Sequence, residues 1–313
     1  MNPLPQAVSV IMRSFNEAWA IGATIRQLFA QDFTGDIELI VIDSGSTDGS
    51  IEIIKAAKPA KLIQIPLGSY IPGVVLNQGA REASHDWLVY LNADATPVGS
   101  NWLTELLQPC LDQPRFGAAF SRQIPRPDCT AVFAHDYDRC FGPQRESKNW
   151  EHFFSMVSCV THRSVLEQVP IREDLQYAED DEWTRRLAEQ GFAILYAADS
   201  VVMHSHNYPL RQSYKRAFGD AKAMAAVSTK HPRAVNYHYF VLLGWLNDAS
   251  RDAKWCRQHH RLGGLPHAIA VRLAQRLGRR DGYHAGWKFY QRDAALFAKA
   301  TSPAAGSPSD LIP

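Results

Sequence analysis

Short apolar runs alternate with amphipathic stretches through the first 125 residues. Residues 7–12 and 87–91 have the length and the β-branched or aromatic content of buried strands. Between such runs, apolar residues recur at helical spacing, as Ile21, Ile25 and Leu28 do. This alternation predicts an α/β fold in which helices cover both faces of a doubly wound, mainly parallel sheet. The other strands that we predict cover residues 37–42, 61–65, 116–121 and 192–197.

The pattern changes twice further along the chain. Residues 125–150 mix Pro, Arg, Asp and aromatic residues without a period, which predicts a long functional loop. After His204 the pattern is helical, first over residues 210–230 and then in three further amphipathic stretches to about residue 299. We therefore expect an α/β domain over residues 1–230 and a helical extension over residues 231–313, which ends in a loose tail.

The helical extension holds most of the positive charge of a chain whose net charge is only +1. Residues 251–292 contain ten Lys or Arg and two Asp, so this segment carries about +8. Basic residues among Trp, Leu and Ile are typical of helices that lie on an anionic membrane. A helical cap with a solvated basic face is the alternative. Nucleic acid is disfavoured because no RNA- or DNA-binding motif accompanies the charge.

The cysteines and the apolar segments bear on the compartment. Five cysteines are spread without a Cys-x-x-Cys spacing, as is typical of buried thiols in a reducing environment. The chain opens without a basic segment followed by an apolar run, and its longest apolar stretch, residues 237–246, is too short to cross a bilayer. We expect a cytoplasmic protein that meets a membrane only at its surface.

Two short acidic stretches are the strongest candidates for chemistry. Asp94 ends an Asn-Ala-Asp sequence at the carboxyl end of the strand predicted at residues 87–91, where a carboxylate can hold a metal ion over a ligand. Asp180 lies in an acidic run that opens a helical pattern, and a carboxylate there is favoured by the helix dipole and can act as a base. The simpler interpretations are a turn residue and an ordinary acidic helix start.

Polar residues after the first two strands form a second group of candidates. Ser14, Asn16 and Glu17 follow the first strand, where they either line a base and ribose pocket or cap the next helix. Asp43 ends the second strand before a glycine-containing turn, and it either shapes that turn or binds a nucleotide. The first strand runs into a segment without glycine, so a dinucleotide-binding enzyme is disfavoured.

His204 and His206 are two residues apart, so on a strand both side chains would face the same side. A lone histidine is more often structural than a ligand. The other ten histidines show no His-Glu-x-x-His or paired Cys/His spacing, which argues against a zinc hydrolase.

Four motifs occur in order along the chain. They are Val-Ile-Met-Arg-Ser-Phe-Asn-Glu at residues 10–17, Ile-Asp-Ser-Gly-Ser-Thr-Asp-Gly at 42–49, Leu-Asn-Ala-Asp-Ala-Thr-Pro at 91–97, and Glu-Asp at 179–180. Together they resemble the motifs of family 2 glycosyltransferases, which have the GT-A fold. The segment Val-Met-His-Ser-His-Asn-Tyr at residues 202–208 also resembles bacterial rhamnosyltransferase-like members, and the resemblance covers about residues 7–220.

The resemblance implies roles for several candidate residues. Asp94 would ligate Mg²⁺ or Mn²⁺, with His204 as a further ligand. Asp180 would be the base that takes the proton from an acceptor hydroxyl. Asn92 stands where an Asp is commoner in the family and would accept a hydrogen bond from ribose. Asn77 belongs to a segment that resembles the family's Arg-Asn-x-Gly sequence near the nucleotide, although a leucine stands in place of the Arg.

The function that we expect is inverting transfer of a sugar from a nucleoside-diphosphate donor to a glycan or lipid-linked acceptor. The resemblance suggests dTDP-rhamnose as the donor and surface polysaccharide assembly, such as O-antigen or capsule, at the inner membrane face. A non-catalytic nucleotide-sugar or glycan-binding protein of the same fold is the alternative, which Asn92 and Leu76 keep open. A nucleotidyltransferase is disfavoured because no glycine- and lysine-rich phosphate loop occurs near the N-terminus.

Overall fold

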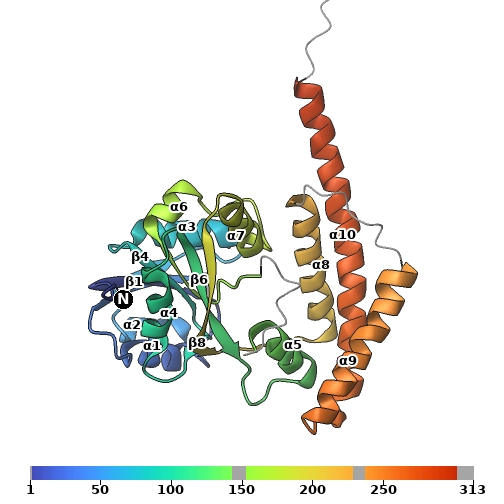
Figure 1. Cartoon of the computed structure of the whole chain (residues 1–313), viewed down its shortest axis with the longest axis horizontal. Helices are drawn as coiled ribbons and strands as arrows, with labels where there is room; N and C mark the ends of the chain where they lie inside the picture. The colour runs from blue at the N-terminus through green and yellow to red at the C-terminus, as the bar shows by residue number, and fades with distance from the viewer. Residues whose placement is uncertain (1, 143–152, 228–236, 302–313) are drawn as a thin grey trace, which may run out of the picture.

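The computed structural model describes residues 2–142, 153–227 and 237–301, with side chains up to residue 288. In this part of the chain an eight-stranded sheet is flanked by helices, and a helical unit stands beside it (Figure 1). The strands are β1 (Ala7–Ser14), β2 (Asp36–Asp43), β3 (Lys61–Gln64), β4 (Trp87–Asn92), β5 (Thr96–Pro97), β6 (Phe116–Ile124), β7 (Ser158–His162) and β8 (Ala193–Met203). The helices are α1 (Ile21–Phe29), α2 (Ser50–Ala56), α3 (Pro72–Glu82), α4 (Trp102–Leu111), α5 (Ala131–Phe141), α6 (Arg163–Gln168), α7 (Glu179–Glu189), α8 (Leu210–Val227), the π-helix η2 (Tyr237–Leu243), α9 (Gly244–Gln258), the 3₁₀ turn η3 (Leu262–Gly264) and α10 (Leu265–Thr301).

The sheet has the strand order β3-β2-β1-β4-β7-β6-β8-β5, and six of its strands run in one direction. β7 and β5 are the antiparallel members. The predicted α/β class with a mainly parallel sheet is therefore confirmed. The order reverses at β1, which pairs with β2 on one side and with β4 on the other. In doubly wound sheets a ligand site forms at the carboxyl ends of the strands at such a reversal.

Alternate residues of β1 belong to two different cores, one on each face of the sheet. Val8, Val10 and Met12 share one core with residues of α1 and α4. Ile11 belongs to the other, together with residues of α3 and α7 such as the fully buried Trp183. Because both faces are covered, the central strands have continuous apolar sequences, which is why they could be recognised.

Two parts of the α/β domain differ from the expectation. β6 and β8 run on to Ile124 and Met203, because they pair with each other in parallel well beyond the predicted strand ends. α5 forms inside the segment that we expected to be an irregular loop. Its residues Val132 and Phe133 are buried with residues of α9 and α10, so this helix depends on contacts that are distant in sequence.

One long helix dominates the helical unit. α10 is one continuous helix of 37 residues, and α8 lies alongside it (Figure 1). Three glycines spaced four residues apart allow this approach: a Cβ on Gly278, Gly282 or Gly286 would come within 2.4 Å of a carbonyl oxygen of α8. α8 lies before the expected boundary at residue 230 but belongs with α10 by its packing. No helix of the described residues is long and apolar enough to cross a membrane.

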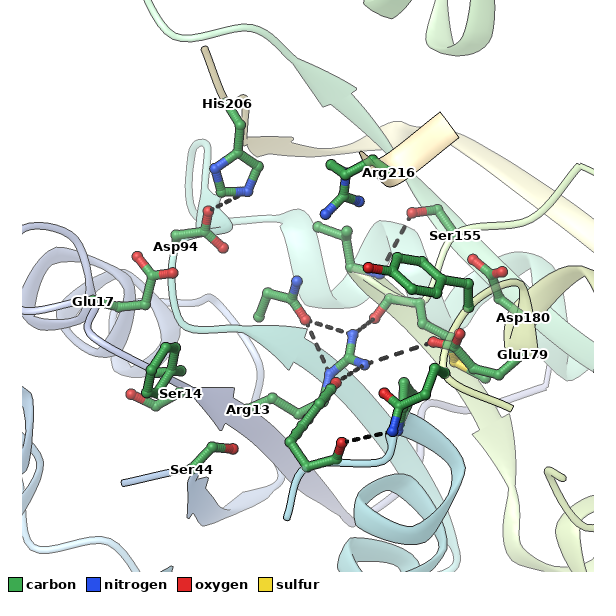
Figure 2. Close-up of a pocket in the computed structure, with 18 of the residues that line it drawn as sticks. Arg13, Ser14, Glu17, Ser44, Asp94, Ser155, Glu179, Asp180, His206 and Arg216 are labelled. Carbon is green, nitrogen blue, oxygen red and sulfur yellow. Dashed lines mark hydrogen bonds and ion pairs between the residues drawn. The ribbon is translucent and has the colours of Figure 1, made fainter. Parts of the chain in front are cut away.

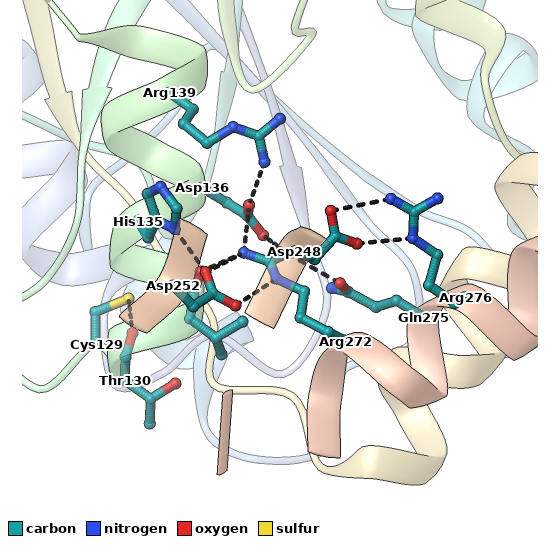
Figure 3. A network of polar contacts seen from close by, with 11 residues as sticks. Cys129, Thr130, His135, Asp136, Arg139, Asp248, Asp252, Arg272, Gln275 and Arg276 are labelled. Carbon is teal, nitrogen blue, oxygen red and sulfur yellow. Dashed lines mark hydrogen bonds and ion pairs between the residues drawn. The ribbon is translucent and has the colours of Figure 1, made fainter. Parts of the chain in front are cut away.

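A buried ionic network fastens the helical unit to α5 (Figure 3). Arg272 of α10 is only 4% exposed and donates hydrogen bonds to Asp252 of α9 and to Asp136 of α5, each at 2.8 Å. His135 Nδ1 lies 2.5 Å from the same Asp252. Buried ion pairs add little net stability but are costly to break singly, so the network fixes how the helical unit sits on the α/β domain.

Candidate active site

A cleft with a volume of about 670 Å³ opens at the carboxyl ends of β1 and β4. Segments after β2 and β8 and segments before α3 and α7 also line it, and α8 closes one side. Figure 2 shows Asp94 and His206 at one end of the cleft and Glu179 and Asp180 at the other. Because α8 supplies part of the wall, the helical unit completes the cleft rather than only covering the domain.

Asp94 and two histidines converge at one end of the cleft, the metal end. Asp94 Oδ2 lies 3.4 Å from His204 Nε2 and 3.2 Å from His206 Nε2. Ligand atoms of the three side chains lie within 4.8 Å of one another. Among the described residues, neither Asp94 Oδ2 nor His204 Nε2 has a hydrogen-bond partner, although both atoms are buried. A carboxylate suits Mg²⁺ or Mn²⁺ and imidazole suits transition-metal ions, so the three side chains fit a divalent cation.

Hydrogen bonds behind His204 set the state of its ring. Its Nδ1 lies 2.9 Å from Gln123 Oε1 and 2.9 Å from the Tyr137 hydroxyl. Gln123 donates from its amide nitrogen to Ser155, so its oxygen is the group that faces the ring. The Nδ1 atom of His204 therefore carries a proton, and Nε2 is the ring nitrogen that faces Asp94 and the cleft. Burial lowers the pKa of His206 to about 4.

The carboxyl of Asp94 is held in its ionised form. Burial alone would raise its pKa, but contacts with His204 and His206 outweigh that effect and the pKa is lowered. Arg126 adds positive charge nearby: its Nη2 donates to the carbonyl oxygen of Asp94 at 2.5 Å, and its guanidinium lies 4.5 Å from the centre of the Trp19 ring. A fixed carboxylate is what a cation ligand requires.

Asp180 lies at the other end of the cleft, the base end, in the first turn of α7. Ala178, just before the helix, has a φ of 59°, and this left-handed residue turns the chain into the helix. Burial raises the pKa of Asp180 to about 8, and the neighbouring Glu179 adds to the effect. A carboxyl whose pKa lies near neutral pH can accept a proton and release it again, which suits a general base.

Arg13, near the end of β1, lies between the two ends of the cleft (Figure 2). Its guanidinium donates to Asn92 Oδ1 from Nε at 3.2 Å and from Nη2 at 2.7 Å. It also donates to the Tyr70 hydroxyl at 3.0 Å and lies 3.9 Å from Glu179. The side-chain oxygen of Asn92, which we expected to accept from ribose, accepts from Arg13 in this structure. Arg13 therefore supplies the cleft with a fixed positive charge that the sequence did not point out.

Ser14 and Glu17 line the cleft as expected, and both have polar atoms available. Among the described residues, Ser14 Oγ and Glu17 Oε2 are buried without a hydrogen-bond partner. Burial raises the pKa of Glu17 to about 7, with the charge of Asp94 as a second cause. Both groups can therefore contact a ligand at the metal end.

Three other residues that we expected to contact the nucleotide form hydrogen bonds within the protein. Asp43 is fully buried and accepts from two backbone N–H groups of the following turn, at 3.0 and 2.9 Å. Asn16 Oδ1 accepts from the N–H of Thr47 at 2.9 Å. Asn77 donates to the carbonyl oxygen of Ile171 at 2.8 Å and so ties α3 to the segment before α7. None of the three is among the described residues that line the cleft. Their polar groups are satisfied by turns and connections, so a ligand would have to displace these bonds.

α8 brings two charged residues to the cleft that sequence reasoning missed. Arg216 and Asp220 are four residues apart, so they lie on one face of the helix. The guanidinium of Arg216 lies 4.7 Å from the centre of the Tyr208 ring. The i, i+4 spacing could have marked the pair, but only the packing of α8 beside the cleft shows where the pair points.

The fold and the cleft define a class of protein: a GT-A-type transferase, with a carboxylate at the switch point of a doubly wound sheet and a second acidic group opposite. Residues 9–169 match the family model described as Glycosyl transferase family 2. The chain belongs to this family and is a glycosyltransferase.

Two relatives with known names point the same way. The chain is 25% identical to the O-antigen chain rhamnosyltransferase RfbN of Salmonella typhimurium over 222 residues, which are 67% of this chain and 70% of RfbN. It is 31% identical to the O-antigen chain rhamnosyltransferase WbaN of Salmonella anatum over 192 residues, which are 58% of this chain and 60% of WbaN. The predicted likeness to family 2 rhamnosyltransferases is confirmed.

Solved structures share the fold. The mannosyltransferase PcManGT from Pyrobaculum calidifontis, in complex with GDP-Man and Mn²⁺, superposes with a TM-score of 0.54 at 21% identity, over 92% of this chain and 86% of that one. Glucosyl-3-phosphoglycerate synthase from Mycobacterium tuberculosis, with Mn²⁺, UDP and phosphoglyceric acid, gives a TM-score of 0.50 at 18% identity, over 73% and 81% of the two chains. At these identities the likeness is one of fold.

Proposed function

We propose that this glycosyltransferase moves a sugar, rhamnose in the first place, from a nucleoside-diphosphate donor to a hydroxyl of a glycan or lipid-linked glycan. The setting would be assembly of a bacterial surface polysaccharide, with a cytoplasmic donor and the inner face of the membrane as the working surface. The names of RfbN and WbaN support the sugar and the setting. The observation that carries the proposal is the pair of aspartates at opposite ends of one cleft, with pKa values shifted in opposite directions.

Asp94, His204 and His206 would hold the divalent cation, Mn²⁺ or Mg²⁺. A bound cation would supply positive charge to the departing diphosphate. Arg13 and Arg216 line the same cleft, so the chain itself offers fixed positive charge for a diphosphate.

Nucleotide recognition would use the unpartnered groups at the metal end. Ser14 and Glu17 face the cleft with free oxygens, as contacts to base or ribose require. Ser44 also lines the cleft, and Asp43 holds the turn that carries it. Asp43 and Asn16 would then support the nucleotide site through the turn, while Asn77 would do so through the segment before α7.

Asp180 would act as the general base. Its carboxylate takes the proton of the acceptor hydroxyl while the acceptor oxygen forms a bond to the anomeric carbon. The bond from that carbon to the diphosphate oxygen breaks, and its electron pair leaves with the nucleoside diphosphate. Attack from the face opposite the leaving group inverts the anomeric configuration. The raised pKa makes Asp180 a stronger base than an ordinary aspartate.

The base end of the cleft favours an uncharged sugar as the acceptor. Glu179, Asp180 and Asp220 all line it, and a phosphate or carboxylate on the acceptor would raise the pKa of Asp180 further and so disfavour the ionised form that a base requires. Carboxylates accept hydrogen bonds from sugar hydroxyls, and the ring of Tyr177 also lines the cleft. These features fit a glycan chain end.

The direct test is to incubate the protein with a panel of dTDP-, UDP- and GDP-sugars, with and without Mn²⁺, and to measure release of the nucleoside diphosphate. We expect metal-dependent release from one donor, faster when a glycan acceptor is added, and a product with the opposite anomeric configuration by NMR. Folded protein that binds a nucleotide sugar but releases nothing from any donor would instead support the non-catalytic alternative.

A further inference from the structure

The outer face of η2 and α9 carries apolar side chains that are exposed within the part of the chain that the structure describes. Tyr239, Leu243 and Leu246 are 72%, 54% and 55% exposed. They are spaced three or four residues apart, so they lie on one face of the helix. Leucines clustered on a single exposed face are a mark of an interaction surface rather than of scattered surface residues.

The same face continues into basic residues. Arg251, Lys254 and Arg257 repeat at three-residue spacing along α9, and all three are exposed. We refer to this stripe, with Leu243 and Leu246, as the α9 face. One half of it is apolar and the other half is cationic.

The two acidic residues of α9 point the other way. Asp248 accepts from Arg276 at 2.7 and 2.9 Å, and Asp252 accepts from Arg272 at 2.8 Å. Figure 3 shows both pairs between α9 and α10. Both carboxylates of α9 therefore face α10, and its outer side carries no acidic residue. The positive charge of residues 251–292 is therefore divided between the two helices. Arginines of α10 form ion pairs inside the helical unit, whereas the basic residues of α9 lie on the surface.

We propose that the α9 face docks on an anionic lipid bilayer. Leu243 and Leu246 would enter the boundary between headgroups and acyl chains, and Arg251, Lys254 and Arg257 would lie among anionic headgroups. A helix with an apolar stripe joined to a basic one has the composition of an interfacial helix. A nucleic acid would use the charge but leave the leucines without a partner.

The position of α9 is compatible with catalysis on the membrane. α9 lies at the outer side of the helical unit, whereas α8 lies toward the α/β domain and lines the cleft (Figure 1). Docking through α9 therefore leaves the cleft open. The docking surface does not depend on the sugar or on the transfer chemistry, so it can be tested without a known substrate.

The test is co-sedimentation of the full chain with vesicles of phosphatidylcholine alone or mixed with phosphatidylglycerol. We expect binding only to the mixed vesicles. Changing Arg251, Lys254 and Arg257 to Gln together should weaken that binding roughly a hundredfold, since each basic residue near an anionic surface adds a similar increment. Leu243→Ser with Leu246→Ser should weaken it by at least about tenfold, because both side chains lose their apolar contact.

A matched control changes Arg26, Lys55 and Lys58 to Gln, which removes the same charge from exposed positions of the α/β domain. This variant should bind the mixed vesicles like the wild type. An equal loss of vesicle binding in both triple variants would overturn the assignment of docking to the α9 face, because net charge alone would then explain binding. Unchanged binding of the leucine variant would overturn insertion, and equal binding of the wild type to both kinds of vesicle would overturn the role of the basic residues. Thermal melting curves check that each variant is folded.

Discussion

Asp94 and Asp180 are the same residue type at opposite ends of one cleft, and their surroundings move their pKa values in opposite directions. At the metal end, two histidines outweigh burial and keep Asp94 ionised. At the base end, burial and the adjacent Glu179 raise the pKa of Asp180 to about 8. Groups whose environments push their pKa values apart take different roles, one as a permanent charge and one as a proton carrier.

The two ends also differ in what holds them. The metal end is built where β4 and β8 finish, and hydrogen bonds between His204 Nδ1 and the side chains of Gln123 and Tyr137 fix the orientation of the His204 ring. The base end is built from the first turn of α7 and from α8, which is positioned by packing on α10. Substitutions at the sheet ends should therefore weaken binding of the cation, and substitutions in the helices should weaken binding of the acceptor.

The largest effect should come from Asp180→Asn. Loss of the base should lower kcat by about a thousandfold, whereas nucleotide binding at the other end of the cleft stays unchanged. The measurement is steady-state transfer together with calorimetric titration of the nucleotide. Asp181→Asn is the control, because Asp181 belongs to the same acidic run but is paired with Arg185 at 2.8 Å. A wild-type rate in Asp180→Asn would remove the base from the mechanism.

Changes at the metal end should act on the cation instead. Asp94→Asn should weaken Mn²⁺ binding by about a hundredfold or more, because removal of a residue behind a ligand already costs about tenfold to a hundredfold. Gln123→Leu keeps every metal ligand but removes one of the two hydrogen-bond partners of the His204 ring. It should weaken Mn²⁺ binding by about tenfold. Titration of Mn²⁺ followed by electron paramagnetic resonance measures both. Unaltered Mn²⁺ affinity in Asp94→Asn would contradict the assigned site.

A smaller effect should follow from Gly282→Ala. The added methyl group would lie 2.1 Å from the carbonyl oxygen of Phe218, so α8 must move away from α10 and carry Asp220 with it. We expect KM for the acceptor to rise several-fold, with Mn²⁺ affinity unchanged. Gly263→Ala, where nothing lies within 4 Å of the new Cβ, should behave like the wild type. Equal effects on cation and acceptor would show that the two ends are not separately held.

The smallest effect is one of stability. The folded-state pKa of Asp180, about 8, lies above its ordinary value of 3.8, so between these values the folded protein holds a proton that the unfolded chain releases. Stability of the wild type therefore falls as pH rises through this window. Asp180→Asn removes the cost of burying the charge. Its Tm should exceed that of the wild type by a few degrees near neutral pH, and by less in acid. Scanning calorimetry across pH checks this, and a lower Tm at neutral pH would contradict it.

The sequence was sufficient for features that depend on neighbouring residues. The central strands are continuous apolar runs, and Asp94 comes directly after one of them, so both the sheet and the position of the carboxylate could be predicted. Asp43 and Asn16 show the limit of such reasoning. A polar residue that shapes a turn and one that binds a ligand have the same sequence signature, and only the hydrogen bonds separate them.

Features that depend on distant contacts were not predictable. α5 is stabilised by burial with α9 and α10, and Asp220 reaches the cleft only because α8 packs on α10. The basic C-terminal segment is a similar case. Its charge was visible in the sequence, but the pairing of Arg272 and Arg276 inside the helical unit decides which helix presents that charge outward.

The division of roles between the two aspartates is tested most directly by calorimetric titration of dTDP, with and without Mn²⁺, into wild type, Asp94→Asn and Asp180→Asn. We expect Mn²⁺ to strengthen nucleotide binding to the wild type and to Asp180→Asn equally, and to have no effect on Asp94→Asn. Mn²⁺-dependent binding that survives in Asp94→Asn, or that is lost in Asp180→Asn, would contradict the assignment of the cation to one end of the cleft and the base to the other.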